Sequence, residues 1–421
     1  MKRFRKLESD RLCFFLFLLC WFSYFSSYIG RLNYSSAMTA MIREQVLSST
    51  QAGFISMVYF FAYGGGQMVN GLLGDKFHPG RMIFVGLAAA AAANLVMGFT
   101  SSFLFMAIIW GMNGYAQAMI WPPVIRIFSE MLPDRLKLRY CVHIVSSQVG
   151  GTFVAYLLAA AVMWLAGWKA VFGAAAVCLG TMALIWLAGF KRIENCALRQ
   201  PEFEKENPAG DVSSRKEGNE KEGGTSFAAL LVGSGLLTVL IPVLVHGMLK
   251  DGVTTWVPTY ISRTFQTPPS LAVLVTTVLP AVNLTGAYAA QFVYRRAERE
   301  AMRAAIPFFL LATAALAAIR LAGNRFLPVT VLLFALITAS MMAVNTIFVN
   351  LLPLKYEKLG RVSTVSGFLN SVAYTGTAVS TFTIGVMVDR WGWNATVTGW
   401  VAVTAFALMI CFWYGRKSVK M

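Results

Sequence analysis

The sequence predicts an all-α membrane protein with twelve transmembrane helices, arranged as two pseudo-symmetric six-helix bundles. The chain of 421 residues is 57% hydrophobic and only 13% charged, whereas soluble proteins have roughly 25% charged residues. Nine stretches lack Asp, Glu, Lys and Arg, and each reaches the length of about 20 residues that a spanning helix needs. Similar residues also recur in the two halves of the chain, at a separation of about 220 residues. A soluble enzyme, a disordered chain and a β-barrel, whose strands would be short and alternating, are excluded.

The first six helices follow in order from the apolar runs. The first continues through Arg31 and Asn33 without a convincing cleavage site, so we predict a retained helix rather than a signal peptide. The fourth contains Pro122 and Pro123, which should break or kink it. The predicted helices are Leu12–Ala40, Gln51–Leu73, Met82–Phe99, Phe103–Ser129, Tyr140–Leu165 and Ala170–Phe190.

Six more helices follow a polar segment. Residues 191–225 are rich in Glu, Lys, Gly and Ser, a composition that cannot form a core. We therefore divide the chain into a first bundle (1–190), a flexible cytoplasmic linker (191–226) and a second bundle (227–421). The helices of the second bundle are predicted as Phe227–Tyr260, Ser270–Tyr294, Ala304–Leu321, Phe326–Leu352, Val362–Val388 and Trp391–Tyr414.

The net charge of +17 is mainly a topology signal. An even number of helices places both termini on one side, and 27 of the 36 Lys and Arg residues lie on that side, against six on the other. Basic residues collect in cytoplasmic loops. We predict a multi-pass protein of the plasma (inner) membrane with both termini in the cytoplasm, without a nucleic-acid partner.

The two bundles carry traces of a duplication. Arg31 and Lys250 are 219 residues apart, Arg139 and Arg361 are 222 apart, and Gly167-Trp168 and Gly392-Trp393 are 225 apart. Parallel six-helix repeats of this kind are typical of the major facilitator superfamily, whose substrate sites lie at the repeat interface near the bilayer midplane.

Two cations inside the spans indicate an anion site. A charge at bilayer depth costs about 2.5–3.5 kcal/mol or more, so Arg31 and Lys250 should face a polar cavity and hold an anion there. The alternatives are that Arg31 snorkels to the far interface and that Asp251 neutralises Lys250. Adjacent helical residues diverge by about 100°, which makes direct Lys250–Asp251 pairing awkward.

Further polar and aromatic residues complete the predicted site. Besides the two cations, we expect substrate contacts from residues that share positions inside the spans: Tyr34, Tyr63, Gln67, Gln117, Trp121, Ser147, Trp256, Asn370 and Tyr374. Hydrogen bonds between helices explain many such residues equally well.

Coupling or gating roles are expected for Asp75, Arg81, Arg126, His143, Asp251 and Asp389. For Arg126, a structural or gating salt bridge with an acidic residue is a better explanation than direct contact with substrate. His143 is taken as the histidine inside a helix core, where it is either a proton carrier or a neutral hydrogen-bonded side chain.

Several motifs resemble the organophosphate:phosphate antiporter family. Tyr28-x-x-Arg31-x-Asn33, Gln117-x-x-x-Trp121-Pro122-Pro123-x-x-Arg126 and Leu249-Lys250-x-Gly252-x-x-x-Trp256 are similar to its first, fourth and seventh helices. Asp75 and Arg81 are similar to the superfamily's loop between helices two and three, and Val388-Asp389 to the start of the family's last helix.

The departures from the family reduce the positive charge. The resemblance implies arginines at positions 31 and 250, a lysine at 67 and a histidine at 147; this chain has Lys250, Gln67 and Ser147. A single carboxylate or other monoanion fits this cavity better than a dianionic phosphate ester.

We therefore predict a secondary active transporter of a small organic anion, phosphorylated or carboxylate, working by alternating access as a monomer. The alternatives are a proton-coupled symporter of a carboxylate or sugar acid, using Asp251 or His143, and a transporter-like membrane sensor. No nucleotide loop, metal cluster or catalytic constellation occurs in the sequence, so neither an enzyme nor a cofactor is expected.

Overall fold

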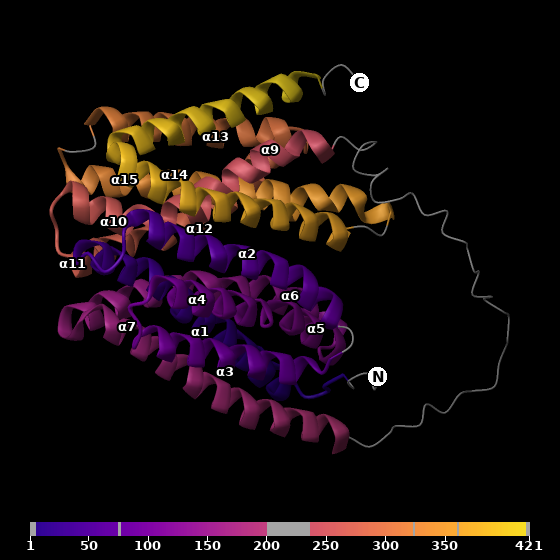
Figure 1. Cartoon of the computed structure of the whole chain (residues 1–421). Helices are drawn as coiled ribbons and strands as arrows, with labels where there is room; N and C mark the ends of the chain where they lie inside the picture. The colour runs from indigo at the N-terminus through magenta and orange to yellow at the C-terminus, as the bar shows by residue number, and fades with distance from the viewer. Residues whose placement is uncertain (1–5, 75–76, 200–235, 323–324, 360–361, 418–421) are drawn as a thin grey trace.

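The computed structural model describes residues 6–74, 77–199, 236–322, 325–359 and 362–417, and within these ranges it contains helices and no strands. The helices of the first half are α1 (Asp10–Arg43), α2 (Ser49–Gly74), α3 (Pro79–Met97), α4 (Phe103–Ala118), α5 (Trp121–Met131), α6 (Asp134–His143) and α7 (Val145–Arg199). Figure 1 shows them as one group of long, roughly aligned helices beside a second group.

The second group contains two stretches of π-helix. Its elements are α9 (Leu236–Gly247), η1 (Met248–Val253), α10 (Thr254–Thr264), α11 (Pro269–Thr276), α12 (Val278–Arg296), α13 (Ala301–Ala322), α14 (Leu327–Asn345), η2 (Thr346–Leu351), η3 (Leu352–Leu359) and α15 (Val362–Lys417). The π-helices are η1 and η2, and η3 is a 3₁₀ helix. The chain ends lie at the same end of the bundle in Figure 1; we refer to it as the terminal face, and to the other end as the opposite face.

Each of the twelve predicted segments has a helical counterpart. Among the described residues, nine stretches are long and apolar enough to cross a membrane. One of these, 135–196, contains most of α6 and both parts of α7, another, 365–416, contains both parts of α15, and α2 lies outside the nine. The predicted fold class is thereby confirmed.

A bend at the same place in each half separates the last two helices. Gly167 inside α7 has φ 76° and ψ 179°, and Gly392 inside α15 has φ 74° and ψ 179°. Only glycine adopts this region readily, because a Cβ would clash with the backbone. The Gly-Trp pairs found 225 residues apart in the sequence are therefore the same structural feature in two copies.

Helix boundaries differ from the predictions where the chain bends. The predicted fourth helix is α4 followed by α5, which begins with Trp121-Pro122-Pro123, as expected of the prolines. The last helix of the first half continues to Arg199, which is nine residues into the predicted linker. The rest of that linker and Asp75 lie outside the described residues.

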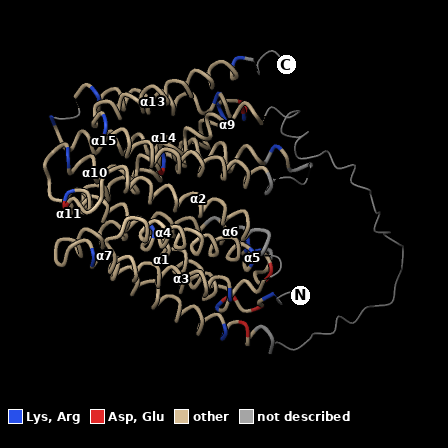
Figure 2. Tube along the Cα trace, in the orientation of Figure 1, with Lys and Arg blue, Asp and Glu red and all other residues tan. Residues whose placement is uncertain are grey.

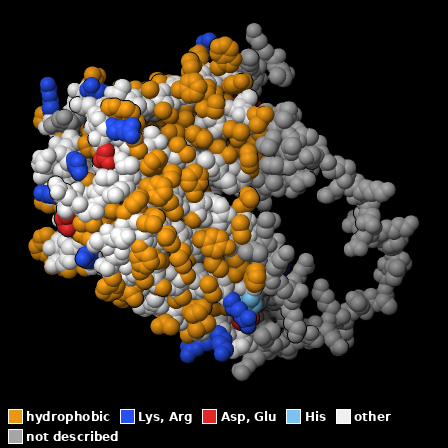
Figure 3. Space-filling model, viewed as in Figure 1, with side chains coloured by type: hydrophobic (Ala, Val, Ile, Leu, Met, Phe, Trp, Pro, Cys, Tyr) orange, Lys and Arg blue, Asp and Glu red, His pale blue; other side chains and the backbone are white. Residues whose placement is uncertain are grey.

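The outside of the bundle suits a bilayer. Figure 2 shows Lys, Arg, Asp and Glu gathered mainly at the two ends of the helices, with few charges along their middles. Hydrophobic side chains cover much of the flank in Figure 3, and many large ones are exposed, including Trp164, Leu184 and Leu332. An extensive apolar flank is expected where lipid replaces water.

The two halves are joined at the opposite face. The hydroxyl groups of Thr39 on α1 and Thr259 on α10 are 3.0 Å apart, and a guanidinium nitrogen of Arg43 donates to the carbonyl of Thr267. Thr39 and Thr259 are 220 residues apart, which is close to the repeat spacing of 219 to 225 residues, so this contact joins corresponding turns of the two halves.

Glycines bring α2 and α15 together beside that contact. A Cβ at Gly53 on α2 or at Gly385 on α15 would lie less than 3.0 Å from a backbone oxygen of the other helix. Small residues at both positions therefore allow the two backbones to approach closely, which is the usual way in which membrane helices pack.

Candidate functional site

A cavity with a free volume of about 80 Å³ lies between the two halves. One ordered water needs roughly 10–15 Å³ by the same measure, so several waters or a small ligand fit. The cavity is lined from both halves: by Tyr28, Arg31, Leu32, Phe60, Gln148, Val149 and Thr152 from the first, and by Lys250, Asp251, Thr254, Thr255, Pro280, Asn283, Met342 and Tyr374 from the second.

Arg31 lies in a cage of aromatic rings. Its guanidinium carbon is 4.7 Å from the ring centre of Tyr63 and between 5.4 and 5.9 Å from four others, those of Tyr28, Tyr59, Phe60 and Tyr374. Among the described residues no carboxylate forms a salt bridge with it. The predicted deep arginine is therefore buried in the bundle, next to a cavity, and does not reach the lipid interface.

Lys250 has a partner of its own. Its ammonium nitrogen lies 3.1 and 3.0 Å from the two carboxylate oxygens of Asp251. Both side chains are largely shielded from solvent, with exposures of 16% and 26%, and both line the cavity. The alternative in which Asp251 neutralises Lys250 is the arrangement in this structure.

Direct pairing of these neighbours was expected to be awkward on an α-helix, yet they do pair, in a turn that is not α-helical. Residues Met248–Val253 form the π-helix η1, whose wider turn carries hydrogen bonds from i to i+5. The hydroxyls of Thr254 and Thr255 bond the carbonyls of Lys250 and Asp251, so backbone groups in this turn are still satisfied.

A network of buried amides fixes the backbone next to Arg31. The carbonyl of Gly30 accepts hydrogen bonds from Asn94 on α3 (3.2 Å) and Asn113 on α4 (3.0 Å). Asn33 donates to Asn94, and Gln117 donates to Asn113. Because these groups tie α1 to two neighbouring helices, they hold the turn that carries Arg31 in one position.

The buried histidine is His246, not His143. His143 is exposed and ends α6, just before the break at Ile144. His246 is 1% exposed on α9. Its ring nitrogens lie 2.7 Å from the carbonyl oxygen of Val243 and 3.0 Å from the amide oxygen of Asn345. Its position four residues before Lys250 could have revealed it in the sequence, since residues four apart share a helix face.

Of the predicted substrate contacts, Arg31, Lys250 and Tyr374 line the cavity, and Tyr63 touches Arg31. Two other predicted contacts, Tyr34 and Trp256, instead form hydrogen bonds between helices. The hydroxyl of Tyr34 bonds the carbonyl of Ala52, and the indole nitrogen of Trp256 bonds that of Thr381. The remaining predicted contacts lie outside the cavity lining: Gln67, Gln117, Trp121, Ser147 and Asn370.

Among the predicted gating residues that the structure describes, Asp251 lines the cavity and the others lie outside its lining. Arg126 pairs with Glu130 at 2.7 Å and donates to the carbonyl of Phe77, so it acts within the first half. Arg81 is exposed near the start of α3. Asp389 instead joins the halves, because its two oxygens accept the backbone N–H groups of Ser49 and Thr50 at the start of α2.

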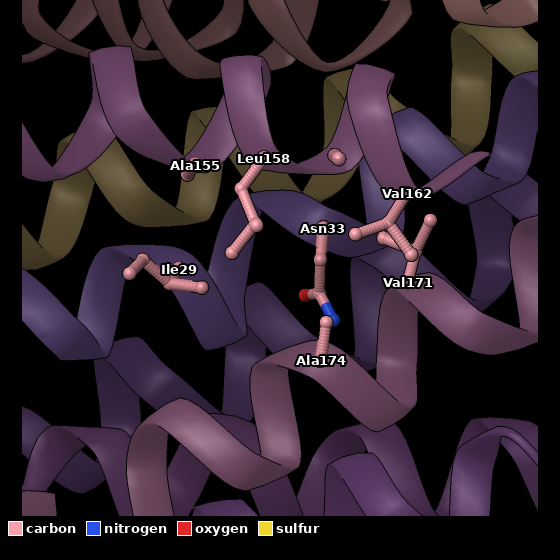
Figure 4. A pocket seen from close by; sticks show the side chains of 8 residues that line it. Ile29, Asn33, Ala155, Leu158, Val162, Val171 and Ala174 are labelled. Atoms are coloured by element: carbon pink, nitrogen blue, oxygen red, sulfur yellow. The ribbon is translucent and has the colours of Figure 1, made fainter. Parts of the chain in front are cut away.

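A second pocket, between α1 and α7, is a packing gap. Figure 4 shows the Asn33 amide pointing among apolar side chains, including Leu158 and Val162. The pocket has no room for a water molecule, and the side-chain Oδ1 of Asn33 is buried with no hydrogen-bond partner among the described residues. We assign no ligand to it.

Several lining residues escaped sequence reasoning. Tyr28 and Phe60 touch both Arg31 and the cavity. Tyr28 is three residues before Arg31 and therefore on the same helix face, which is a signal that the sequence does offer. The contributions of Met342 and Thr152 depend on how distant helices pack, for which no local pattern exists.

Residues 20–380 match the family model of the Major Facilitator Superfamily. The chain belongs to this superfamily. It is 26% identical to a probable hexose phosphate transport protein of Chlamydia pneumoniae over 39% of this chain and 36% of that protein. It is 24% identical to the membrane sensor protein UhpC of Escherichia coli over 39% of this chain and 38% of that protein. The matched stretches thus span little more than a third of these relatives.

Solved structures agree on the fold. A bacterial homolog of the human lysosomal transporter Spinster, in an inward-facing and unoccupied conformation, superposes with a TM-score of 0.77 over 98% of each chain. The sequence identity is 15%, so this likeness concerns the fold alone. The predicted resemblance to organophosphate transporters is confirmed by the sequence relatives.

Proposed function

We propose that this protein is a secondary active transporter of a small organic anion that works by alternating access. Arg31 and Lys250 hold the anion in the cavity between the halves. The transporter is a monomer of the plasma (inner) membrane, with both termini and the 191–226 linker in the cytoplasm between bundles 1–190 and 227–421. The observation that carries the proposal is one cavity lined by a cation from each repeat.

The charge balance of the cavity favours a substrate with one negative charge. The Lys250–Asp251 pair sums to zero, so Arg31 leaves the cavity with one net positive charge among its described lining residues. A carboxylate or a singly ionised phosphate ester would make the loaded cavity neutral, which lowers the cost of closing it away from water. A dianion would need one accompanying proton.

The proposal is tested by uptake into proteoliposomes that contain the purified protein. The radiolabelled anions are glucose 6-phosphate, glycerol 3-phosphate, 3-phosphoglycerate and gluconate. Arg31→Gln and Lys250→Gln should each abolish the uptake that the wild type shows. A charge-assisted hydrogen bond contributes about 1.5–3 kcal/mol, so we expect roughly a ten- to hundred-fold loss of affinity from either change.

Matched controls are available at the helix ends. Arg325 and Lys169 are exposed and lie outside the cavity lining, so Arg325→Gln and Lys169→Gln should transport like the wild type. Normal uptake by both the Arg31 and the Lys250 variants would contradict the assigned anion site. Binding without any uptake by the wild type would favour a sensor, the role named for the relative UhpC.

Proton-coupled symport is the alternative within transport. Asp251 lines the cavity, whereas His143 lies outside its lining, so Asp251 is the better proton carrier of the two. Symport requires a proton gradient and no internal substrate. Exchange requires internal substrate and no gradient, so uptake into empty liposomes with and without a pH step separates them.

A further inference from the structure

The two cations that line the cavity, Arg31 and Lys250, have different partners in this structure. Lys250 is held by both oxygens of Asp251, at 3.1 and 3.0 Å. Arg31 has aromatic rings instead of a carboxylate within the described structure. A guanidinium is weakly hydrated and stacks well on rings, whereas an ammonium is a compact, strongly hydrated charge. Without Asp251, Lys250 would be the cation that suffers more from loss of water.

Few other charged groups surround Asp251. Arg31 and Lys250 share the cavity with it. His246, one turn earlier on α9, bonds Val243 and Asn345 through its two ring nitrogens. Tyr374, which also lines the cavity, approaches from α15. The bidentate contact therefore pairs Asp251 with Lys250 in preference to its other neighbours.

This pairing has a consequence for the transport cycle. Alternating access requires the cavity to close at least once per cycle, and burying an unpaired charge is strongly unfavourable. A carrier with two bare cations would depend on substrate to neutralise them before each closure. A carrier that supplies its own anion would not depend on substrate for this neutralisation.

We propose that Asp251 is an internal counter-anion: it holds Lys250 while the site is empty and yields it to the anionic group of the substrate. The empty protein can then reorient, which allows net transport instead of obligatory exchange. This inference rests on the proposed function, because it assumes that Lys250 is a substrate ligand.

Distance measurements between spin labels test this without any substrate. Ser101 and Arg325 are exposed in equivalent loops of the two halves, so cysteines there, in a background free of the six native cysteines, report separation of the halves at the opposite face. In substrate-free lipid nanodiscs the otherwise wild-type protein should show two distance populations. Asp251→Asn should show one, because an unpaired Lys250 keeps the cavity hydrated.

A double variant separates the charge effect from damage to the fold. Lys250→Gln with Asp251→Asn removes both charges and should restore the second population. Two populations in Asp251→Asn alone would overturn the proposal. A single population in the double variant would also overturn it, because Asp251 would then act only through structure. Since no substrate is used, these outcomes are independent of whether Arg31→Gln abolishes anion uptake.

Discussion

The burial of Arg31 is balanced by the aromatic rings around it. One cation–π contact contributes about 0.5–2 kcal/mol depending on burial. Five rings lie within 6 Å of the guanidinium carbon. Their combined effect is of the same order as the ~2.5–3.5 kcal/mol that an arginine costs at bilayer depth. The cage thus keeps the cation available to a substrate without committing it to a carboxylate.

Tyr63 is the ring closest to the guanidinium, at 4.7 Å, and its replacement should show the size of this effect. Tyr63→Leu should lower thermal stability in detergent by several degrees, whereas Tyr63→Phe, which keeps the ring, should remain close to wild type. In an Arg31→Gln background the same Tyr63→Leu change should cost less. An equal cost in both backgrounds would mean that the ring only fills space.

The sequence could predict the cations but not their surroundings. Arg31 and Lys250 stand out because charges inside apolar runs are rare, and both line the cavity. The rings around Arg31 come from α1, α2 and α15, and aromatic residues are too common in membrane helices for any one to be singled out. Trp256 illustrates the limit: it belongs to a recognisable motif, yet its indole bonds the carbonyl of Thr381.

At the scale of the elements, the kind of helix around Lys250 could not be predicted from the sequence. An α-helical period was assumed through Leu249-Lys250-Asp251, and it places adjacent side chains about 100° apart. The turn is instead the π-helix η1, and Lys250 pairs with Asp251 within it. Isolated π-turns have no strong sequence signature, but they occur often at functional sites.

The requirement for glycine at the two bends inside α7 and α15 can be tested by substitution. Gly167→Ala and Gly392→Ala should each destabilise the protein by about 1–3 kcal/mol, because the backbone there adopts a glycine-only conformation. Gly173→Ala is the matched control: it has ordinary helical geometry and open space around the added methyl group. Midpoints of thermal unfolding in one detergent compare the three. Equal midpoints would show that the bends tolerate a side chain.

At the scale of the whole molecule, the halves meet at the opposite face through close packing of α2 on α15 and through polar contacts. Asp389 accepts two backbone N–H groups from the start of α2, at 3.2 and 2.7 Å. This position combines a helix cap with the positive end of a helix dipole. An ionic cap that reaches across the two halves stabilises the state in which this face is closed.

Asp389→Ala should therefore shift the protein toward opening at this face. Thr39→Cys on α1, buried at the contact with Thr259, should then react faster with a membrane-impermeant maleimide added from that side. Arg390→Gln, which changes the neighbouring exposed charge, should leave the labelling rate unchanged. A slower or equal rate in the Asp389 variant would contradict a role in closure.

The Thr39–Thr259 contact also bears on how the two halves are related to each other. A residue that meets its own equivalent is what an isologous interface produces around a two-fold axis. The 220 residues between the two threonines are close to the 219 to 225 residues that separate the other paired features of the halves. The two halves of this chain are thus arranged as the two subunits of a homodimer would be. Arg31 and Lys250, which are 219 residues apart, both line the cavity, and only Lys250 has an acid beside it.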